Sequence, residues 1–360
     1  MIDFRHYHIA FSLWIPAILI AVAGVLSIYS ATQGYQTDYA TRQLCWLLAG
    51  IALAIAVSLI PHLFFHHYAT IIYAASLATL VAVLILGKER NGAKAWLGFG
   101  SLGIQPSEFA KLAVIFLFGR YFADFEEHRY SWKYYFLSFG ILAIPMALIL
   151  LQPDLGTLLT FFPVIIAMFW VTGTKLSLLL TTFLGVVAAF PPAWFFFLRS
   201  HQKQRLLLTW QPERDPWGYG YQALMSKLTL GSGMLYGLGY GESRMSRLNF
   251  LPERHTDFIF SVFGEEWGLI GGLVILALYF LLIVAALRIS RLSKDLFGVT
   301  VATGIAVLLA THVIMNIGMC AGVLPVIGVP LPLFSYGGSS LLCTMIALGV
   351  LQGIYADATK

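Results

Sequence analysis

Ten apolar segments dominate this chain and limit what it can fold into. They lie at 9–31, 43–60, 67–87, 106–123, 134–151, 157–172, 176–198, 258–287, 298–321 and 334–356 of the 360 residues. A helix that spans a bilayer needs about 20 predominantly apolar residues, which most of these segments provide. No stretch resembling a separate soluble domain is left. The sequence therefore predicts an all-α, polytopic membrane protein, a single domain over residues 1–360 with about ten transmembrane helices.

The composition supports this class. Hydrophobic residues make up 59% of the chain and charged residues 11%, with a mean hydropathy of +0.81. A soluble domain of ordinary composition carries about 25% charged residues, so this chain could not cover a water-facing surface. We therefore exclude a soluble enzyme, a disordered protein and a secreted disulfide scaffold. The net charge of +5 is explained by membrane topology and one basic loop, and no nucleic-acid partner is expected.

Lys and Arg are distributed unevenly among the short loops. With the N-terminus inside, cytoplasmic segments carry nine of them: Arg5, Arg120, Arg129, Lys133, Lys175, Arg288, Arg291, Lys294 and Lys360. The short loops on the other side carry four: Arg42, Lys88, Arg90 and Lys94. Cytoplasmic loops of membrane proteins carry the excess of positive residues. The sequence thus predicts cytoplasmic N- and C-termini.

One long connection, residues 199–256, follows the seventh segment on the outer side. Loops of this length are usually functional or disordered. It contains eight basic residues: Arg199, Lys203, Arg205, Arg214, Lys227, Arg244, Arg247 and Arg254. Its acidic residues are Glu213, Asp215, Glu242 and Glu253, and its Trp and Tyr residues suit a partly helical layer at the membrane interface. We interpret this loop as a binding layer for an anionic ligand; the alternative is a plain solvated cap.

Ionisable residues in apolar segments are rare here and are candidates for function. Glu108 and Lys111 are three residues apart, so they share a helix face and can pair. This pair is either a structural contact or part of a polar pocket that faces the bundle interior. Asp154, which follows Gln152 and Pro153, either caps the next helix or belongs to a site.

The densest group of polar residues lies at 251–260, where the long loop re-enters the membrane. Thr256 or Asp257 is either an ordinary N-cap or part of a functional site. Glu265 and Glu266 follow about 12 Å deeper at helical rise. We expect both of them to face protein or water rather than lipid.

Four motifs in register resemble the SEDS (shape, elongation, division, sporulation) family, which includes RodA and FtsW. They are Gln105–Glu108 with Lys111, Gln152–Thr157, Leu251–Phe260, and Gly328–Pro332 running into Ser335–Ser339. The resemblance covers about residues 10–356, and Asn316–Met319 and Pro325–Pro330 are of the RodA kind rather than the FtsW kind.

The resemblance implies a peptidoglycan glycosyltransferase that polymerises lipid II for cell elongation and rod shape. It also implies ten transmembrane helices in the bacterial inner membrane, and a class B penicillin-binding protein that crosslinks the product as partner. By position, Asp257 matches the family's essential aspartate, and Glu108, Lys111 and Asp154 match its other motif residues. Arg205 also lies in a recurring family stretch.

The reaction implied by the resemblance needs a base for the incoming hydroxyl and positive charge at the departing pyrophosphate. We assign the base to Asp257; the alternative is that Asp257 binds a divalent cation, Mg²⁺ or Mn²⁺. A neighbouring Arg254 would lower the pKa of Asp257, and burial would raise it. The α-linked donor and β-linked product predict a single inverting displacement. Six residues are predicted to bind substrate: Glu108, Lys111, Asp154, Arg205, Arg254 and His255.

Two other functions compete with the enzyme. A lipid II flippase would use Glu108 and Lys111 as a transport path, and a non-catalytic scaffold for a penicillin-binding protein would tolerate loss of Asp257. A transporter concentrates polar groups near the bilayer midplane, whereas the densest polar cluster here is predicted on the outer, extracytoplasmic face. The sequence therefore favours the enzyme, with its active site on that face.

Overall fold

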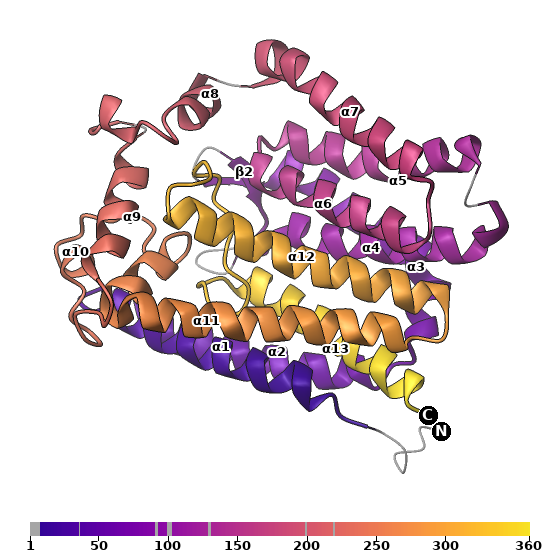
Figure 1. The fold of residues 1–360 in the computed structure, drawn as a ribbon, viewed down its shortest axis with the longest axis horizontal. Helices are drawn as coiled ribbons and strands as arrows, with labels where there is room; N and C mark the ends of the chain where they lie inside the picture. Colours follow the sequence, from indigo (N-terminus) through magenta and orange to yellow (C-terminus); the bar gives the residue numbers. More distant parts are fainter. Residues whose placement is uncertain are drawn as a thin grey trace.

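The computed structural model describes residues 8–35, 37–90, 93–98, 103–128, 131–198, 200–218 and 220–360. Within these ranges the chain forms a bundle of long helices that run roughly along one direction (Figure 1). The start of α1 and the end of α13 lie at one end of the bundle, and the short helices α9 and α10 lie at the other. Arg5, Arg129, Arg199 and Tyr219 fall outside the described residues.

Each predicted apolar segment coincides with a helix. These are α1 (Phe11–Ala31), α2 (Tyr39–Ser58), α3 (His62–Leu86), α4 (Pro106–Asp124), α5 (Trp132–Leu151), α6 (Leu155–Val171), α7 (Leu176–Pro192), α11 (Ile259–Leu292), α12 (Leu296–Cys320) and α13 (Gly338–Ala358). Among the described residues, seven helices are long and apolar enough to cross a membrane: α1, α2, α3, α5, α11, α12 and α13. The all-α membrane class is confirmed, while spanning by α4, α6 and α7 stays a prediction.

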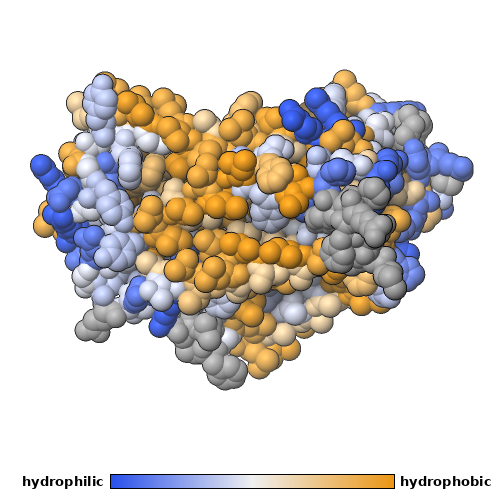
Figure 2. All heavy atoms as spheres, turned by 90° about the horizontal axis from the view of Figure 1, so that it is seen from below, coloured by the Kyte–Doolittle hydropathy of each residue, from blue (hydrophilic) through white to orange (hydrophobic). Residues whose placement is uncertain are grey.

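The surface agrees with a protein embedded in a bilayer. Figure 2 shows one face on which an apolar band crosses the middle and hydrophilic residues gather at both ends. Large apolar side chains on the long helices are exposed, including Phe183 and Phe280. Because such surface is costly in water and favourable in lipid, the band marks the part of the bundle in contact with acyl chains.

The interior of the bundle is built around α12 and α13, the most deeply buried of the candidate spans. Helix α12 packs against α4, α6 and α11, and α13 packs against α2. These contacts fix the positions of the loops that connect the central helices, and those loops carry most of the predicted site residues.

The long loop is partly helical in its described residues, as predicted. It contains α8 (Ser200–Leu207), η4 (Pro212–Arg214), α9 (Tyr221–Ser232) and α10 (Arg244–Arg247), preceded by the short helix η3 (Ala193–Phe197). Elsewhere, η2 (Glu126–His128) follows α4. A small antiparallel pair, β1 (Lys88–Arg90) and β2 (Ala93–Trp96), connects α3 to the segment before α4.

Helix α11 is broken near its start at Gly268, which has φ 66° and ψ −167°. The segment 233–239 docks at the break: Leu269 N donates to Met234 O (2.9 Å) and Leu238 N donates to Glu265 O (2.9 Å). A Cβ at position 268 would lie 2.4 Å from Gly237 N. The break therefore needs glycine, and it anchors the long loop to the bundle.

Glu265 and Glu266 are both about 1% exposed and contact protein, as predicted. The Ser243 hydroxyl donates to Glu265 Oε2 (2.5 Å), and the Ser30 hydroxyl donates to Glu266. These two carboxylates therefore attach the long loop and the end of α1 to the start of α11.

Of the two alternatives for Thr256 and Asp257, the helix cap is excluded, because the N-cap of α11 is Phe258 and no side chain caps the helix. One predicted boundary is wrong. The last helix begins at Gly338 rather than near residue 334. The loop before it is held by Gln43 of α2, whose amide donates to Ser335 O (3.1 Å) and accepts from Gly337 N (3.2 Å). These long-range bonds favour a loop over another helical turn.

Candidate active site

A cavity of about 1520 Å³ lies between the helices and the loops that include 252–257, and it extends from these loops along α5, α6 and α7. Its walls come from α2, α5, α6, α7, α8 and the start of α13, and from the loops 252–257 and 325–330. Segments distant in the sequence meet here because α11, α12 and α13 all have a loop at this end.

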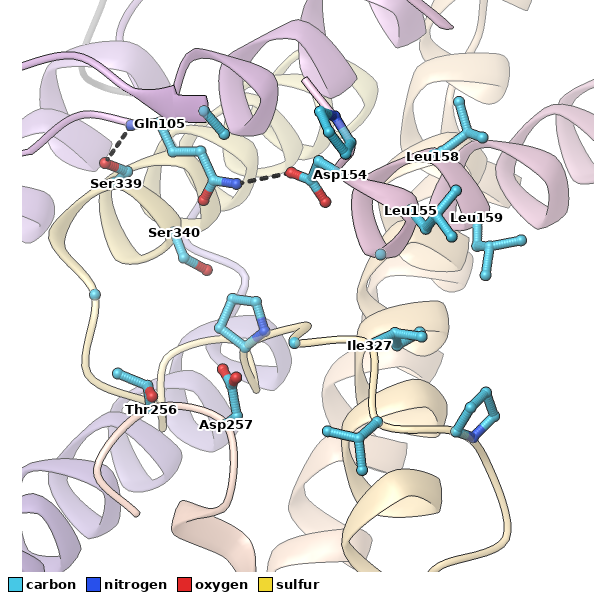
Figure 3. Close-up of a pocket in the computed structure, with 18 of the residues that line it drawn as sticks. Gln105, Asp154, Leu155, Leu158, Leu159, Thr256, Asp257, Ile327, Ser339 and Ser340 are labelled. Carbon is cyan, nitrogen blue, oxygen red and sulfur yellow. Dashed lines mark hydrogen bonds between the residues drawn. The ribbon is translucent and has the colours of Figure 1, made fainter. Parts of the chain in front are cut away.

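The walls differ in chemistry. Helices α5, α6 and α7 contribute apolar side chains: Phe136, Phe139, Leu155, Leu158, Leu159, Phe162 and Val186. The remaining wall carries polar groups: Arg42, Gln105, Asp154, Arg205, His255, Asp257 and Ser339. Figure 3 shows this juxtaposition, with the leucines of α6 on one side and Gln105, Ser339 and Asp257 on the other. A cavity divided in this way suits an amphiphile that has a polar head and an apolar chain.

Asp257 projects its carboxylate into the cavity (Figure 3). Its side chain is only partly accessible, and burial raises its pKa to about 7. Glu253 raises this pKa further, and Arg205 lowers it. The prediction that a neighbouring Arg254 would lower it does not hold: burial is the largest cause of the shift, and Arg205 supplies the positive charge. A carboxylate with a pKa near neutrality is a much better proton acceptor than an ordinary aspartate.

A tight turn holds Asp257 in place. The carbonyl of Glu253 accepts hydrogen bonds from the backbone N–H groups of Thr256 (3.2 Å), Asp257 (3.1 Å) and Phe258 (3.3 Å). Glu253 itself has a φ of 49°, which is unusual for a residue other than glycine. Strained backbone of this kind persists only where the surroundings enforce it, and it is common at functional sites.

Arg205 of α8 and Arg42 of α2 supply guanidinium groups to the cavity wall. Neither side chain has a hydrogen-bond or ion-pair partner within the described part of the chain. Guanidinium groups without protein partners can bind the oxygens of a phosphate or pyrophosphate in the cavity.

His255 lies beside Asp257 in an aromatic cluster. Its ring is 4.6 Å from that of Tyr39 and 5.7 Å from that of Tyr336, measured between centroids. Burial lowers its pKa, so the ring is neutral at neutral pH. Its Nδ1 has no hydrogen-bond partner among the described residues. The ring therefore lines the cavity while its Nδ1 is buried without a hydrogen-bond partner among the described residues.

The sequence matches the family FTSW_RODA_SPOVE, described as "Cell cycle protein", over residues 7–360. The chain belongs to this family. The resemblance predicted from the four motifs is therefore confirmed.

Relatives and solved structures of the FtsW/RodA/SpoVE family align with nearly the whole chain. Peptidoglycan glycosyltransferase MrdB of Escherichia coli K12 is 38% identical, covering 93% of this chain and 90% of its own. The structure "Structural coordination of polymerization and crosslinking by a peptidoglycan synthase complex" matches at TM-score 0.85 and 30% identity, covering 99% of both chains. The rod shape determining protein RodA of Thermus thermophilus matches at TM-score 0.73 and 28% identity, again over 99% of both chains.

In this family member, the predicted site residues fall into two groups. Asp257, Asp154, Arg205 and His255 line the cavity. Glu108, Lys111 and Arg254 are buried outside its lining, at 4%, 3% and 2% exposure. The pairing predicted for Glu108 and Lys111 is present, with Lys111 Nζ 2.7 Å from Glu108 Oε1.

Arg254 is used to hold the structure together. Its Nε donates to Ala31 O (2.7 Å), its Nη1 donates to Asn249 Oδ1 (2.6 Å), and its guanidinium lies 4.5 Å from the Tyr35 ring centroid. It therefore attaches the end of α1 to the loop before α11. Arg254 was predicted to bind substrate, but its side chain is buried outside the cavity lining.

The predicted site residues omit several groups that the structure brings to the cavity. These groups are Arg42, whose charge enters the sequence argument only through the topology, and Gln105 and Glu253, which lie in motifs whose predicted site residues are their neighbours. Their side-chain chemistry was visible in the sequence. Their approach to Asp257 depends on how α2, α4 and α11 pack, which no local pattern reveals.

Proposed function

We propose that this chain is a peptidoglycan glycosyltransferase that polymerises lipid II into glycan strands for cell elongation and rod shape. The observation that carries the proposal is the Asp257 carboxylate, with its pKa raised to about 7, in a cavity that combines cationic groups with an apolar wall. Lipid II has the matching parts: a disaccharide, a pyrophosphate and a polyprenyl chain. The E. coli relative is named a peptidoglycan glycosyltransferase.

In the proposed reaction, Asp257 accepts the proton of the acceptor sugar hydroxyl. The hydroxyl oxygen attacks the anomeric carbon of the donor, and the bond from that carbon to the pyrophosphate oxygen breaks. The electron pair leaves with the polyprenyl pyrophosphate, so one displacement inverts the configuration. General base catalysis of this kind contributes about 10²–10⁴-fold to the rate.

Arg205 and Arg42 are the candidates for binding the pyrophosphate oxygens, since both line the cavity. Positive charge already in place where negative charge develops stabilises the transition state without reorganisation. The apolar wall from α5, α6 and α7 accommodates the first part of the polyprenyl chain. His255 and Asp154 contact the sugar or peptide portion in this proposal.

A divalent cation is the alternative role for Asp257. Within the described ranges, no group of three or more His, Cys, Asp and Glu side chains could hold a metal ion. Mg²⁺ is often bound by one or two carboxylates together with substrate phosphates, a role that Asp257 and Glu253 fit. A bound cation would supply positive charge to the departing pyrophosphate.

Turnover by Asp257→Glu, measured against Mg²⁺ and Mn²⁺ concentration and with a chelator, separates the two roles. Turnover that does not depend on the cation supports the base. A steep cation dependence that shifts between wild type and Asp257→Glu supports the metal-binding role.

The proposal places the protein in the bacterial inner membrane, with both termini in the cytoplasm and the cavity on the extracytoplasmic side. Its partner is a class B penicillin-binding protein, which crosslinks the strands; the solved structure at TM-score 0.85 belongs to a complex that coordinates polymerisation with crosslinking. Labelling from outside the cell tests the orientation. A cysteine at the exposed Trp217 of the long loop should react, and one at Lys360 should not.

The experiment that tests the function is polymerisation of labelled lipid II by the purified chain with its partner, resolved on a glycan gel. Wild type should form polymer, and Asp257→Asn should form none while remaining folded. Equal polymer from both proteins would remove Asp257 from catalysis. No polymer from either, in a folded and paired preparation, would direct attention to a flippase or a scaffold.

A further inference from the structure

Helix α12 carries a row of polar side chains in an otherwise apolar segment. His312, Asn316 and Cys320 are four residues apart, so they lie on one face of the helix. They are 4%, 0% and 0% exposed. Buried polar groups in a membrane protein are costly unless each finds a partner. The partners of this row are the Asp257 carbonyl, the carbonyls of the loop that follows α12, and the Lys111 side chain on α4.

Asn316 binds both of these segments with one side-chain amide. Its Nδ2 donates to Asp257 O at 2.9 Å and to Val329 O at 2.8 Å. The Cys320 thiol lies 3.6 Å from the same Asp257 carbonyl. The amide thus fixes the distance between the Asp257 backbone and residue 329.

His312 extends the connection to the buried pair on α4. Its Nε2 is 2.8 Å from Lys111 Nζ, and its Nδ1 is 3.3 Å from Pro330 O. An ammonium group can only donate and a carbonyl can only accept, so Nε2 accepts and Nδ1 carries the proton. Lys111 also donates to Glu108 Oε1 at 2.7 Å. A continuous chain of hydrogen bonds therefore runs from Glu108 to the carbonyl of Pro330.

The loop held in this way lies against the reacting group. Gly328, Pro330 and Asp257 all line the cavity. A Cβ placed at Gly328 would be 3.4 Å from Asp257 Oδ2, so the loop passes close to the carboxylate at a residue that has no side chain. A shift of the loop would change the space in which the carboxylate meets a substrate hydroxyl.

We propose that His312 and Asn316 are positioning residues for Asp257, and that the Glu108–Lys111 pair acts on the site through His312 and the 328–330 loop rather than by touching substrate. The proposal rests on the proposed glycosyltransferase function. It explains why Glu108 and Lys111 are buried outside the cavity lining. Groups that orient the ligands of a metal site change activity by about 10–100-fold when they are removed, and we expect an effect of the same order here.

Two variants divide the His312 contacts. In His312→Gln, the amide oxygen can still accept from Lys111, but the donor to Pro330 O is lost. In His312→Asn, the amide nitrogen lies near the position of Nδ1 and can still donate to Pro330 O, but the acceptor for Lys111 is lost. Each variant therefore breaks one hydrogen bond of the series that runs from Glu108 to Pro330 O: His312→Gln breaks the bond to Pro330 O, and His312→Asn breaks the bond to Lys111.

Thr311→Val is the matched control. Thr311 is the residue before His312, is similarly buried, and donates its hydroxyl to Val307 O (2.7 Å) within α12 itself. Its loss removes a buried hydrogen bond from the same helix without contact to the loop or to Lys111.

The first measurement is steady-state polymerisation of lipid II by the full chain with its penicillin-binding partner. Both His312 variants should lower kcat by about 10–100-fold with KM for lipid II within twofold of wild type, and Thr311→Val should leave both constants unchanged. Wild-type kcat in both variants, or a raised KM at unchanged kcat, would overturn the proposal. Wild-type kcat in His312→Asn alone would show that Lys111 does not act through His312.

Hydrogen–deuterium exchange provides a second measurement that does not depend on activity. The variants should exchange faster than wild type in peptides that cover 321–337, and Thr311→Val should not. If wild type makes no polymer, the glycosyltransferase function fails, and unchanged exchange in the variants would separately overturn the positioning role. Asn316→Ser, which keeps one donor, is measured in the same way if the His312 variants do not purify.

Discussion

The side-chain amide of Gln105 donates a hydrogen bond to Asp154 Oδ2 at 3.1 Å, joining the start of α4 to the start of α6 (Figure 3). The same carboxylate caps α6 by accepting from Thr157 N (3.0 Å) and Thr157 Oγ1 (2.8 Å). Gln105 N in turn donates to Ser339 Oγ (3.0 Å), at the start of α13. Asp154 is therefore both a helix cap and part of the wall that holds three helices around the cavity.

Substitution of Asp154 should separate these two roles. Asp154→Asn keeps the helix cap, since Asn and Asp are equally good N-caps, but it weakens the bond to Gln105. We expect nearly wild-type thermal stability with reduced polymerisation. Asp154→Ala loses the cap as well, which costs about 1–2 kcal/mol of stability. Thermal unfolding in detergent with a lipid II assay checks both. Equal loss of stability in the two variants would contradict a separate role in the cavity wall.

Asp257→Asn should abolish polymerisation and also stabilise the protein. Burial raises the pKa of this carboxyl from 3.8 to about 7. A raised pKa in the folded state gives stability that is present below about pH 4 and is lost as pH rises through about 7. The side-chain amide of the Asp257→Asn variant does not ionise, so the variant does not lose this stability as the pH rises. Each pKa unit corresponds to about 1.4 kcal/mol, and the effect is smaller here because the Asp257 side chain is partly exposed and its charge is therefore screened.

The measurement is the unfolding midpoint of wild type and Asp257→Asn between pH 5 and pH 8. The difference should favour the variant at pH 8 by a few degrees and shrink toward pH 5. A variant that is less stable than wild type at pH 8 would show that the carboxylate is stabilised by a charge partner rather than destabilised by burial.

The rate of polymerisation should rise with pH through about 7, because the base is active when deprotonated. Glu253→Gln removes a negative charge that raises this pKa, so the midpoint of kcat/KM should move to lower pH. Thr209→Val is a control that leaves the charges unchanged: it removes only the hydrogen bond from the Thr209 hydroxyl, just after α8, to the backbone carbonyl of Arg205. A midpoint that does not move in Glu253→Gln would mean that Asp257 does not set the pH profile.

The architecture was predictable because a helix that is exposed to lipid must be apolar over a sufficient length. Apolar runs of sufficient length identified each of the long helices, and the local pattern at Asp154 correctly offered a helix cap. The spacing of Glu108 and Lys111 likewise gave their contact, since a helix places residues three apart on one face. These features depend on a few neighbouring residues.

The features that could not be predicted depend on contacts between segments that are distant in the sequence. His312 lies within an apolar run, and its partner Lys111 is 201 positions away, so neither its burial nor its role could be seen locally. The polar cluster indicated the segment 251–260 and the resemblance to the family singled out Asp257, but the helix cap that the same pattern also offered is absent. The carbonyl of Glu253 binds the turn instead, in a conformation that the surrounding packing enforces.

The break in α11 is another feature that the sequence did not show, and it leads to a prediction about the long loop. Gly268 has a φ of 66° at the point where the segment 233–239 forms backbone hydrogen bonds with α11 in place of the helix's own. In Gly268→Ala, a Cβ would lie 2.5 Å from Leu235 O. Backbone strain in this region costs about 1–3 kcal/mol, apart from the clash. We expect the segment to detach from α11 and the protein to lose stability.

Gly140→Ala provides the control, because position 140 is within α5 and a Cβ there meets nothing within 4 Å. Alanine stabilises a helix by about 1 kcal/mol relative to glycine, so this variant should be slightly more stable.

Limited proteolysis reports the difference directly: Gly268→Ala should be cut faster than wild type within 233–250, and Gly140→Ala should not. Because α9 and α10 border the loop that carries Asp257, Gly268→Ala should also polymerise lipid II more slowly. Wild-type resistance to the protease together with wild-type activity would mean that α11 can close the break without the docked segment.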